Sequence, residues 1–341
     1  MPNKKKVSIE QIAEAASVSI ATVSRVLNRS DNVREETAHR VLEAAKRLNY
    51  RPDRVARRMR VKSADSLLVG LIITDVGNPF FSELSRGVED VAYKHRHALL
   101  ICNTDENPEK EKFYLDSMLS EKVSGLIIAP SKGNASYLKE LVDNDYPVVC
   151  ADRSPNDIDI DTVTIDNEKG AYLAVKRLTD LGHQRIGIIN GIEGISTTEK
   201  RFQGYQKAIK SAGIPLYDEL VIYEDYKEAG GRNAMQHFLS LDNPPTAIFS
   251  TNNLMTLGCL EEIYSQNVRI PEDIAIIGFD DMPWAGALNP PLTAVKQPGY
   301  ELGLNAIELL FKRIENPSRN TMNLVLNPEL IVRKSCGTQI S

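Results

Sequence analysis

The sequence lacks the features that mark several large classes of protein. No apolar run in its 341 residues approaches the roughly 18 residues of a membrane span, and no apolar segment of a secretory signal follows the polar N-terminus. Its four cysteines form no Cys-x-x-Cys pair, and its five histidines have no zinc-binding spacing. We therefore expect a cytoplasmic protein with reduced thiols, no membrane segment, no metal site and no cofactor.

Motifs of common enzyme classes are also missing. The sequence has no Gly-x-Gly-x-x-Gly, no Gly-x-x-x-x-Gly-Lys-Ser/Thr and no Gly-x-Ser-x-Gly. The adjacent acids Asp280 and Asp281 are suited to acid–base chemistry, but no nucleophile or metal cluster accompanies them. We expect a binding protein and not an enzyme.

The net charge of −5 conceals an asymmetry along the chain. Residues 1–62 hold 15 of the 41 Lys and Arg but only 7 of the 46 Asp and Glu, a balance of +8, and the remaining residues have a balance of −13. A basic N-terminal segment on an acidic body indicates a module that binds a polyanion such as nucleic acid. Charge alone is equally compatible with a solvated face.

The N-terminal segment has the pattern of a helix-turn-helix. Ser8 and Ser19 are candidate N-caps of two short helices, which only Ser17 and Val18 separate. A third helix is expected over about residues 35–48. Its inward side chains are predicted to be Val41, Leu42, Ala45 and Leu48.

The second helix is the predicted recognition helix, because the first residues of such a helix face base edges in the major groove. Arg25 can pair with a guanine, whereas Ile20 and Ala21 offer apolar contact to a thymine methyl group. A helical hairpin that merely caps the body is the alternative. Short hydroxyl side chains suited to phosphate contacts are Ser19, Thr22 and Ser24.

Three stretches of this segment match a known signature: VSIATVSRVLN at 18–28, LNYRP at 48–52 and RVAR at 54–57. They resemble the lactose/galactose repressor (LacI/GalR) family. In that family the last stretch is a hinge helix that folds in the minor groove when two subunits pair on a palindromic operator. The resemblance implies DNA-binding roles for Asn28, Arg54, Ala56 and Arg57, with Met59 in place of the family's leucine wedge.

Two positions depart from that family's pattern. Ser17 stands where a glycine is usual, which predicts strain at a left-handed position. Arg34 stands where a serine usually caps the third helix, which predicts a weaker helix start. We expect a helix-turn-helix domain over residues 1–49 and a hinge helix with linker over residues 50–64.

From residue 65 onward, apolar strands alternate with amphipathic helices. This alternation predicts an α/β fold with parallel, doubly wound sheets, and the number of strands favours two sheets in two lobes, as in periplasmic binding proteins. One lobe is expected over about 65–163 and 293–324, and the other over about 164–292 and 325–341. Candidate strands span residues 67–74, 98–103, 125–129, 148–152, 162–165, 185–190, 220–223, 247–250, 274–279 and 294–297.

Polar and aromatic side chains follow the ends of these strands, where open α/β sheets bind ligands. Each alone is compatible with a core residue, a helix cap or an ion pair, but together they favour a ligand site. Carboxylates accept hydrogen bonds from hydroxyls, arginines donate them, and aromatic rings cover the C–H face of a sugar. The candidates are Asn78, Phe80, Phe81, Asp152, Arg153, Arg201, Asn252, Asp280, Trp284 and Gln297.

Over residues 65–334 the body resembles the effector domain of the same family and periplasmic monosaccharide-binding proteins such as ribose-binding protein. The sugar-contacting pattern matches at all of these candidates except Trp284. Tyr226 stands where an aromatic wall is common, and Asn253 replaces a common aspartate. The resemblance implies a free monosaccharide, with a ribose-like aldose as first candidate, because purine-binding relatives lack this Asp-Arg and Gln combination.

Charge gives a further expectation about the ligand. Two acids, Asp152 and Asp280, offset two arginines, Arg153 and Arg201, so the site is predicted to be near neutral. A sugar phosphate or uronate would meet both carboxylates in a partly dry pocket. A neutral sugar is therefore favoured.

Taken together, these features predict that the protein is a transcriptional repressor of sugar-utilisation genes. It would bind double-stranded operator DNA as a homodimer, and a tetramer is less expected because no heptad-bearing tail follows Arg333. Sugar in the site would favour one arrangement of the lobes and so change DNA binding through the hinge helices. The alternative is a regulator of the catabolite-control type, which senses a phosphoprotein partner instead of a free sugar.

Overall fold

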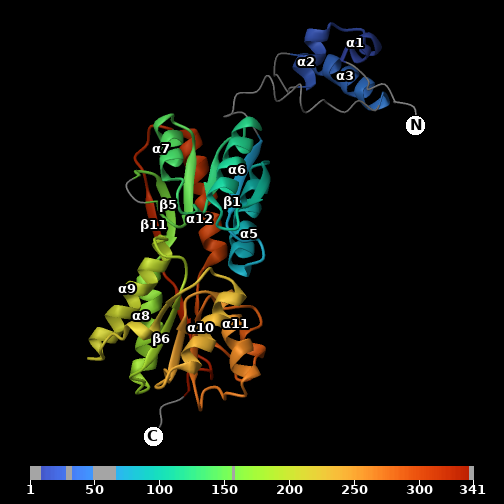
Figure 1. Ribbon diagram of the computed structural model, residues 1–341. Helices are drawn as coiled ribbons and strands as arrows, with labels where there is room; N and C mark the ends of the chain where they lie inside the picture. Colours follow the sequence, from blue (N-terminus) through green and yellow to red (C-terminus); the bar gives the residue numbers. More distant parts are fainter. Residues whose placement is uncertain (1–8, 28–32, 49–66, 156–157, 338–341) are drawn as a thin grey trace. The chain divides into compact units, whose positions relative to one another are not determined.

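The computed structural model describes residues 9–27, 33–48, 67–155 and 158–337. The chain divides into two compact units, Met1–Val61 and Lys62–Ser341, called here the head and the body. Figure 1 shows the elements of both units. Among the described residues, no helix is both long and apolar enough to cross a membrane.

The head contains three short helices around a small apolar core. They are α1 (Ile9–Ala16), α2 (Ile20–Leu27) and α3 (Glu35–Arg47). Ile12, Val23 and Val41 are fully buried between them. Ser19 caps α2, because its hydroxyl accepts a hydrogen bond from the Thr22 N–H at 3.1 Å. The predicted helix-turn-helix is therefore present.

Three details of the head bear on the sequence predictions. Ser17 has φ 54°, the left-handed position that favours glycine. Arg34 precedes α3 without a side-chain cap. Leu42 was predicted to face inward but is 53% exposed, and Ala44 is buried instead, because the 3.6-residue period that places Val41 inward continues to Ala44 and Ala45. The predicted hinge helix lies outside the described residues.

The first lobe of the body, lobe 1, is a six-stranded sheet in the order β11-β5-β4-β3-β1-β2. Its neighbouring strands pair in parallel. The strands are β1 (Leu68–Ile73), β2 (Ala98–Asn103), β3 (Leu126–Ile128), β4 (Val148–Asp152), β5 (Asp161–Ile165) and β11 (Asn323–Leu326). The helices are α5 (Pro79–Lys94), α6 (Pro108–Ser120), α7 (Ala135–Asp143) and α12 (Gly299–Glu315). Helices α5 and α12 cover one face of the sheet, and α6 and α7 cover the other.

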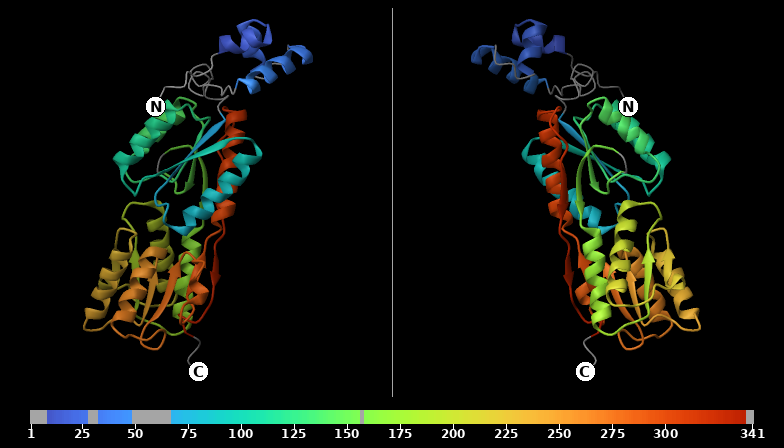
Figure 2. Two further views of the ribbon diagram at one scale, coloured as in Figure 1. Left: turned by 90° about the vertical axis from the view of Figure 1, so that its right-hand side faces the viewer. Right: turned by 90° about the vertical axis from the view of Figure 1, so that its left-hand side faces the viewer.

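Lobe 2 repeats this plan with the order β12-β10-β9-β8-β6-β7, in which only the β10–β12 pair is antiparallel among the described strands. The strands are β6 (Ile186–Asn190), β7 (Val221–Tyr223), β8 (Ala247–Ser250), β9 (Ala275–Phe279), β10 (Thr293–Lys296) and β12 (Glu329–Ile331). The helices are α8 (Asn167–Asp180), α9 (Ser196–Ser211), α10 (Glu228–Ser240) and α11 (Asn253–Ser265). Helices α8 and α9 cover one face, and α10 and α11 cover the other. Figure 2 shows the two lobes in profile.

The chain crosses between the lobes three times, and the structure corrects the predicted crossing points. The prediction assigned residues 293–324 to lobe 1, but β10 pairs with β9 and β12 and so belongs to lobe 2. The crossings follow β5, β10 and β11, a few residues after Thr164, Pro291 and Val325, where they were predicted. Strands β11 and β12 were not predicted, because they are only four and three residues long and contain no fully buried residue.

Glycines allow the closest helix contacts in both lobes. A Cβ at Gly303 of α12 would lie 2.0 Å from the Leu84 carbonyl oxygen of α5, and a Cβ at Gly258 of α11 would lie 1.9 Å from the Glu228 oxygen of α10. Such contacts leave no space for a methyl group, so these helix pairs depend on glycine.

Replacing Gly258 by alanine is therefore expected to destabilise the body by about 1–3 kcal/mol, since the overpacking cost exceeds the ~1 kcal/mol gain in helix propensity. Urea unfolding measures the change. Gly286→Ala is the control, because the added Cβ would lie 3.9 Å from the Arg333 side chain, an ordinary van der Waals distance. Equal midpoints for both variants would contradict this account of the α10–α11 contact.

Candidate functional site

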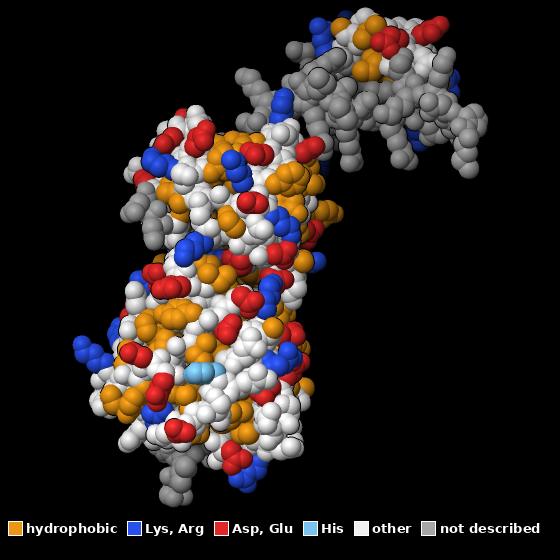
Figure 3. Space-filling model, in the orientation of Figure 1, with side chains coloured by type: hydrophobic (Ala, Val, Ile, Leu, Met, Phe, Trp, Pro, Cys, Tyr) orange, Lys and Arg blue, Asp and Glu red, His pale blue; other side chains and the backbone are white. Residues whose placement is uncertain are grey.

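A cleft lies between the two lobes of the body, where the carboxyl ends of both parallel sheets meet. Residues that follow eight strands contribute to it, as expected for open α/β sheets. Figure 3 shows acidic and basic side chains next to one another where the lobes meet. The cleft is lined by Thr74, Asp75, Asn78, Phe80, Phe81, Glu106, Asp152, Arg153, Thr197, Arg201, Asp225, Tyr226, Lys227, Asn252, Leu254, Asp280 and Gln297.

Ten of the eleven predicted ligand-binding residues line this cleft. Trp284 does not, because the chain turns after β9, with the Ala285 N–H donating to the Met282 carbonyl, and the indole packs against the apolar core of lobe 2. Their position at the ends of strands predicted that the other ten residues line the cleft. That position does not predict the path of the loop that follows a strand, and Trp284 lies in such a loop.

Backbone geometry directs two carboxylates into the cleft. Asp152 ends β4 with φ 69°, and Asp280 follows β9 with φ 77°. The left-handed region is costly for residues other than glycine, although aspartate tolerates it better than most. Sheet pairing holds the second of them, because the Asp280 N–H donates to the Val295 oxygen at 2.9 Å. Local strain of this kind is typical of functional sites.

Arg201 reaches the cleft from α9 in a fixed orientation. Its Nε donates to Asn167 Oδ1 at 2.8 Å, and its Nη1 donates to the Thr251 oxygen at 2.6 Å. The guanidinium lies 3.9 Å from the centre of the Phe279 ring, in a cation–π contact. No carboxylate forms a salt bridge with Arg201 among the described residues, so its charge acts on the cleft as a whole.

Gln297 and Asp280 form a buried pair in lobe 2. The Gln297 amide nitrogen donates to Asp280 Oδ1. The Gln297 Oε1 atom is buried and has no hydrogen-bond partner in the described part of the chain. A buried acceptor without a partner is costly, and a ligand hydroxyl would satisfy it.

Burial raises the pKa of both cleft carboxyls. For Asp152 the desolvation is opposed by the positive charges of Arg153 and Arg201. For Asp280 it is opposed by Arg201 and by the hydrogen bond from Gln297. Both carboxyls therefore take up a proton at a higher pH than an exposed aspartate does.

The aromatic side chains of the cleft come from both lobes. Phe80 and Phe81 of α5 make an edge-to-face contact with centroids 5.1 Å apart. Tyr226 of lobe 2 has φ 64°, and its ring packs so closely on Gly191 that a Cβ there would lie 1.8 Å from it. The same ring lies 5.6 Å from the Arg153 guanidinium across the cleft.

Arg153 has a partner that the sequence analysis missed. Its Nη1 and Nη2 atoms donate to the two carboxylate oxygens of Glu106, each at 2.7 Å. Arg153 Nε also lies 3.3 Å from Asp152 Oδ2. Glu106 comes shortly after β2, as Asp152 comes at the end of β4, so its strand-end position was an available signal.

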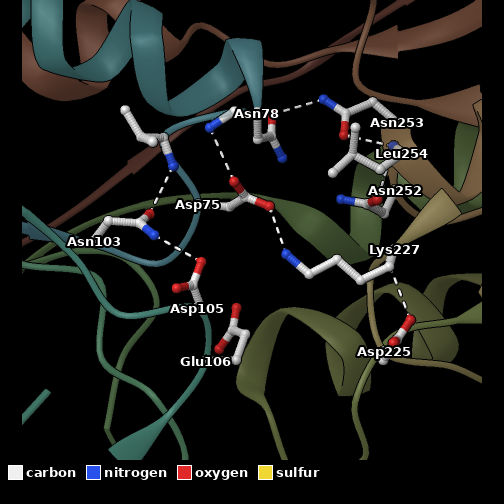
Figure 4. A network of polar contacts seen from close by, with 12 residues as sticks. Asp75, Asn78, Asn103, Asp105, Glu106, Asp225, Lys227, Asn252, Asn253 and Leu254 are labelled. Atoms are coloured by element: carbon white, nitrogen blue, oxygen red, sulfur yellow. Dashed lines mark hydrogen bonds and ion pairs between the residues drawn. The ribbon is translucent and has the colours of Figure 1, made fainter. Parts of the chain in front are cut away.

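Two polar contacts join the lobes at the cleft (Figure 4). Lys227 Nζ donates to Asp75 Oδ2 at 2.7 Å, and Asn253 Nδ2 donates to Asn78 Oδ1 at 2.7 Å. Asn253, noted as a departure from the family pattern, therefore links the lobes. Asp75, Asp225 and Lys227 were not predicted as site residues.

The observed charge of the cleft differs from the prediction. Two acids were predicted to balance two arginines, whereas the lining contains five carboxylates and three bases, a formal balance of −2. The cleft is also narrow: about 40 Å³ is open to the centres of water molecules, room for a few waters. A sugar must therefore displace side chains or widen the cleft.

The head presents the predicted recognition surface on α2. Ile20 and Arg25 are exposed together with Ser19 and Ala21, while Thr22 and Ser24 are half-buried. The predicted contact residues outside the described part of the chain are Asn28, Arg54, Ala56, Arg57 and Met59.

Family comparison agrees with both units. Residues 8–53 match the bacterial regulatory proteins of the lacI family, and residues 66–331 match the periplasmic binding proteins and sugar binding domain of the LacI family. The chain belongs to the LacI family. It is a DNA-binding transcriptional repressor and not an enzyme, and its two-sheet α/β body with N-terminal helices confirms the predicted fold class.

The similarity to individual LacI-family proteins extends over nearly the whole chain. The HTH-type transcriptional repressor PurR of Histophilus somni is 35% identical over 97% of this chain and 99% of its own. Catabolite control protein A of Priestia megaterium is 36% identical over 96% of this chain and 99% of its own. The lac repressor dimer bound to operator and the anti-inducer ONPF is 27% identical, with a TM-score of 0.84 over 98% of this chain and 100% of its own.

Proposed function

We propose that this LacI-family repressor binds a palindromic operator as a homodimer and is controlled by a small neutral monosaccharide in the cleft. A ribose-like aldose is the first candidate, and sugar-utilisation genes are the proposed targets. The observation that supports this proposal most strongly is that hydrogen-bond donors and acceptors suited to a sugar converge on one cleft. Asp152 and Asp280 supply acceptors, Arg201 supplies donors, and Gln297 Oε1 is an acceptor without a partner among the described residues.

The edge of lobe 1 supports a homodimer. Strand β2 ends the sheet, and an exposed edge strand is normally covered or protected in a soluble protein. Large hydrophobic side chains are exposed nearby in sequence: Tyr93 at 76%, Ile101 at 48% and Phe113 at 64%. Figure 3 shows hydrophobic side chains on the side of lobe 1 that carries α6. A second copy of the chain would cover this surface.

The contacts between the lobes supply a means of control. Each lobe has its own core, and the Asp75–Lys227 and Asn78–Asn253 bonds join them at the cleft. A sugar that contacts both lobes would bind one arrangement of them more tightly, and it shifts the equilibrium only by that difference in affinity. The proposed hinge helices would transmit the change to DNA.

A thermal-shift screen tests the ligand. Neutral aldoses and ketoses, uronates, sugar phosphates and purines are added separately to the full-length protein. A ligand at 100 times its Kd stabilises the folded protein by about 2.7 kcal/mol. Stabilisation by a neutral aldose is expected, and a response to phosphorylated sugars or purines alone would contradict the proposal.

A regulator that senses a phosphoprotein partner is the second candidate. The 36% identity to Catabolite control protein A favours it. The two candidates differ in the screen, because a body that senses only a protein would be stabilised by no sugar. Absence of any sugar response, with operator binding intact, would place this candidate first.

The raised pKa of the cleft carboxyls predicts a pH dependence. Sugar hydroxyls donate to ionised carboxylates, so affinity is lost as the pH falls through the raised pKa of Asp152 and Asp280. In the free protein the sign is opposite, because a carboxyl whose pKa is raised on folding contributes stability that is lost as the pH rises. Calorimetric titrations from pH 7.5 down to the lowest pH at which the protein stays folded, with the melting temperature recorded at each pH, measure both effects. An affinity independent of pH over this interval would contradict the assignment.

A further inference from the structure

Glu106 is held toward the cleft by a constrained loop. Asp105 and Glu106 have φ 53° and 59°, two consecutive left-handed residues without glycine. The Asp105 N–H donates to the Thr74 oxygen at 2.8 Å, and the Asp105 carboxylate accepts from Asn103 at 2.7 Å and from Lys110 at 2.5 Å. Such strain persists only where surrounding contacts over-determine it. Figure 4 shows Glu106 beside this network.

The Glu106–Arg153 pair is buried in the cleft. Its two hydrogen bonds of 2.7 Å form the fork geometry that matches a guanidinium to a carboxylate. The side chains are only 12% and 7% exposed. Arg153 retains N–H groups beyond those two bonds, so it can still donate to a sugar hydroxyl. Its positive charge, however, is already neutralised.

The charges of the other two bases in the cleft are also offset by carboxylates. Lys227 is paired with Asp75. The positive charge of Arg201 interacts electrostatically with the carboxylates of both Asp152 and Asp280. A carboxylate or phosphate brought into the cleft would therefore meet an excess of negative charge in a poorly solvated space.

We propose that Glu106 is a specificity-determining residue that restricts the cleft to uncharged ligands by occupying the fork of Arg153. The inference rests on the proposed function and extends it to the class of ligand excluded. It assigns that selectivity to one side chain. Without the Glu106 charge, Arg153 keeps only Asp152, which lies 3.3 Å from its Nε atom, and both of its Nη atoms lose their carboxylate partner. An anionic ligand would supply a new partner for this buried guanidinium.

Glu106→Gln tests the proposal in the full-length protein. Calorimetric titration at pH 7.5 compares matched probes: D-ribose with D-ribose 5-phosphate, D-glucose with D-glucuronate, and D-galactose with D-galacturonate. The wild type is expected to bind a neutral member and not its anionic partner. Glu106→Gln should gain affinity for the anion by roughly tenfold or more, the size of one charge-assisted hydrogen bond, and should change neutral-sugar affinity by less than that factor.

Three further variants make the result specific. Glu109→Gln removes the same charge from an exposed position close in sequence and should gain nothing. The double variant Glu106→Gln with Arg153→Gln should lose the gain, because the guanidinium is then absent. Glu106→Ala also removes the carboxylate that pairs with Arg153, and it replaces the glutamine variant if that variant fails to fold. The melting temperatures of the ligand-free proteins show which variants fold.

The outcomes separate the inference from the function on which it rests. Neutral-sugar binding by the wild type, without an anion gain in either folded Glu106 variant, overturns the inference alone. Equal binding of neutral and anionic probes by the wild type also overturns it. Absence of binding by every protein overturns the sugar-responsive function and the inference together.

Discussion

Asp280→Ala is expected to abolish the effect of sugar on operator binding while operator affinity in the absence of sugar stays unchanged. Asp280 is 7% exposed at the end of β9, accepts from Gln297 and has the charge of Arg201 nearby. Hydrogen bonds to a charged group contribute about 1.5–3 kcal/mol each, so loss of two hydroxyl contacts lowers sugar affinity by about 3 kcal/mol or more, over roughly a hundredfold. Operator titrations with and without the sugar found in the screen measure the response.

The control for this experiment is Asp180→Ala. Asp180 is in lobe 2 and forms an exposed ion pair with Lys176, and such a surface pair contributes little to stability. It should respond to sugar as the wild type does. A normal sugar response in the Asp280 variant would place the effector elsewhere in the molecule.

The second large effect is expected at the head. Arg25→Ala should weaken binding to the selected operator by about 1–3 kcal/mol, or roughly 5- to 150-fold, because one bidentate contact to a guanine is lost. Arg25 is exposed on α2, whereas Val23 and Val26 on the same helix are buried and maintain its packing. Competition assays with the operator and with random duplex DNA separate base recognition from charge.

Arg40→Ala is the matched control, since Arg40 is an exposed arginine on α3. It should reduce affinity for operator and random DNA by similar, smaller factors, as expected when only general electrostatic attraction is lost. Equal losses of operator affinity for the two variants would show that Arg25 contributes charge and no base recognition.

Much of the fold follows from local patterns. Buried strands such as β4 and β9 consist mostly of continuous apolar residues, and the amphipathic helices between such strands indicate a parallel sheet. Local patterns do not predict which sheet a strand joins, because that depends on pairing between segments distant in sequence. Strand β10 was placed in the wrong lobe for this reason. Strand β11 is only four residues long, and its three apolar residues are too short a run to indicate a strand.

The candidate cleft was predictable to a similar degree. Residues that directly follow buried strands, such as Asp152 and Asp280, could be proposed because strand ends meet in this class of fold. The fork between Glu106 and Arg153 joins residues 47 positions apart, and the Asp75–Lys227 bond joins residues 152 positions apart. Neither pairing leaves a periodic trace in the sequence, so the charge of the cleft was misjudged.

The central claim is that sugar in the cleft and operator DNA on the head bias the same equilibrium. Its most direct test is a pair of titrations of the full-length protein: operator affinity with and without saturating sugar, and sugar affinity with and without saturating operator. Linkage requires both ratios to be the same factor, and allosteric coupling of ~1–3 kcal/mol makes that factor roughly 5 to 150. The account predicts equal factors in this range. Sugar binding that leaves operator affinity unchanged would contradict it.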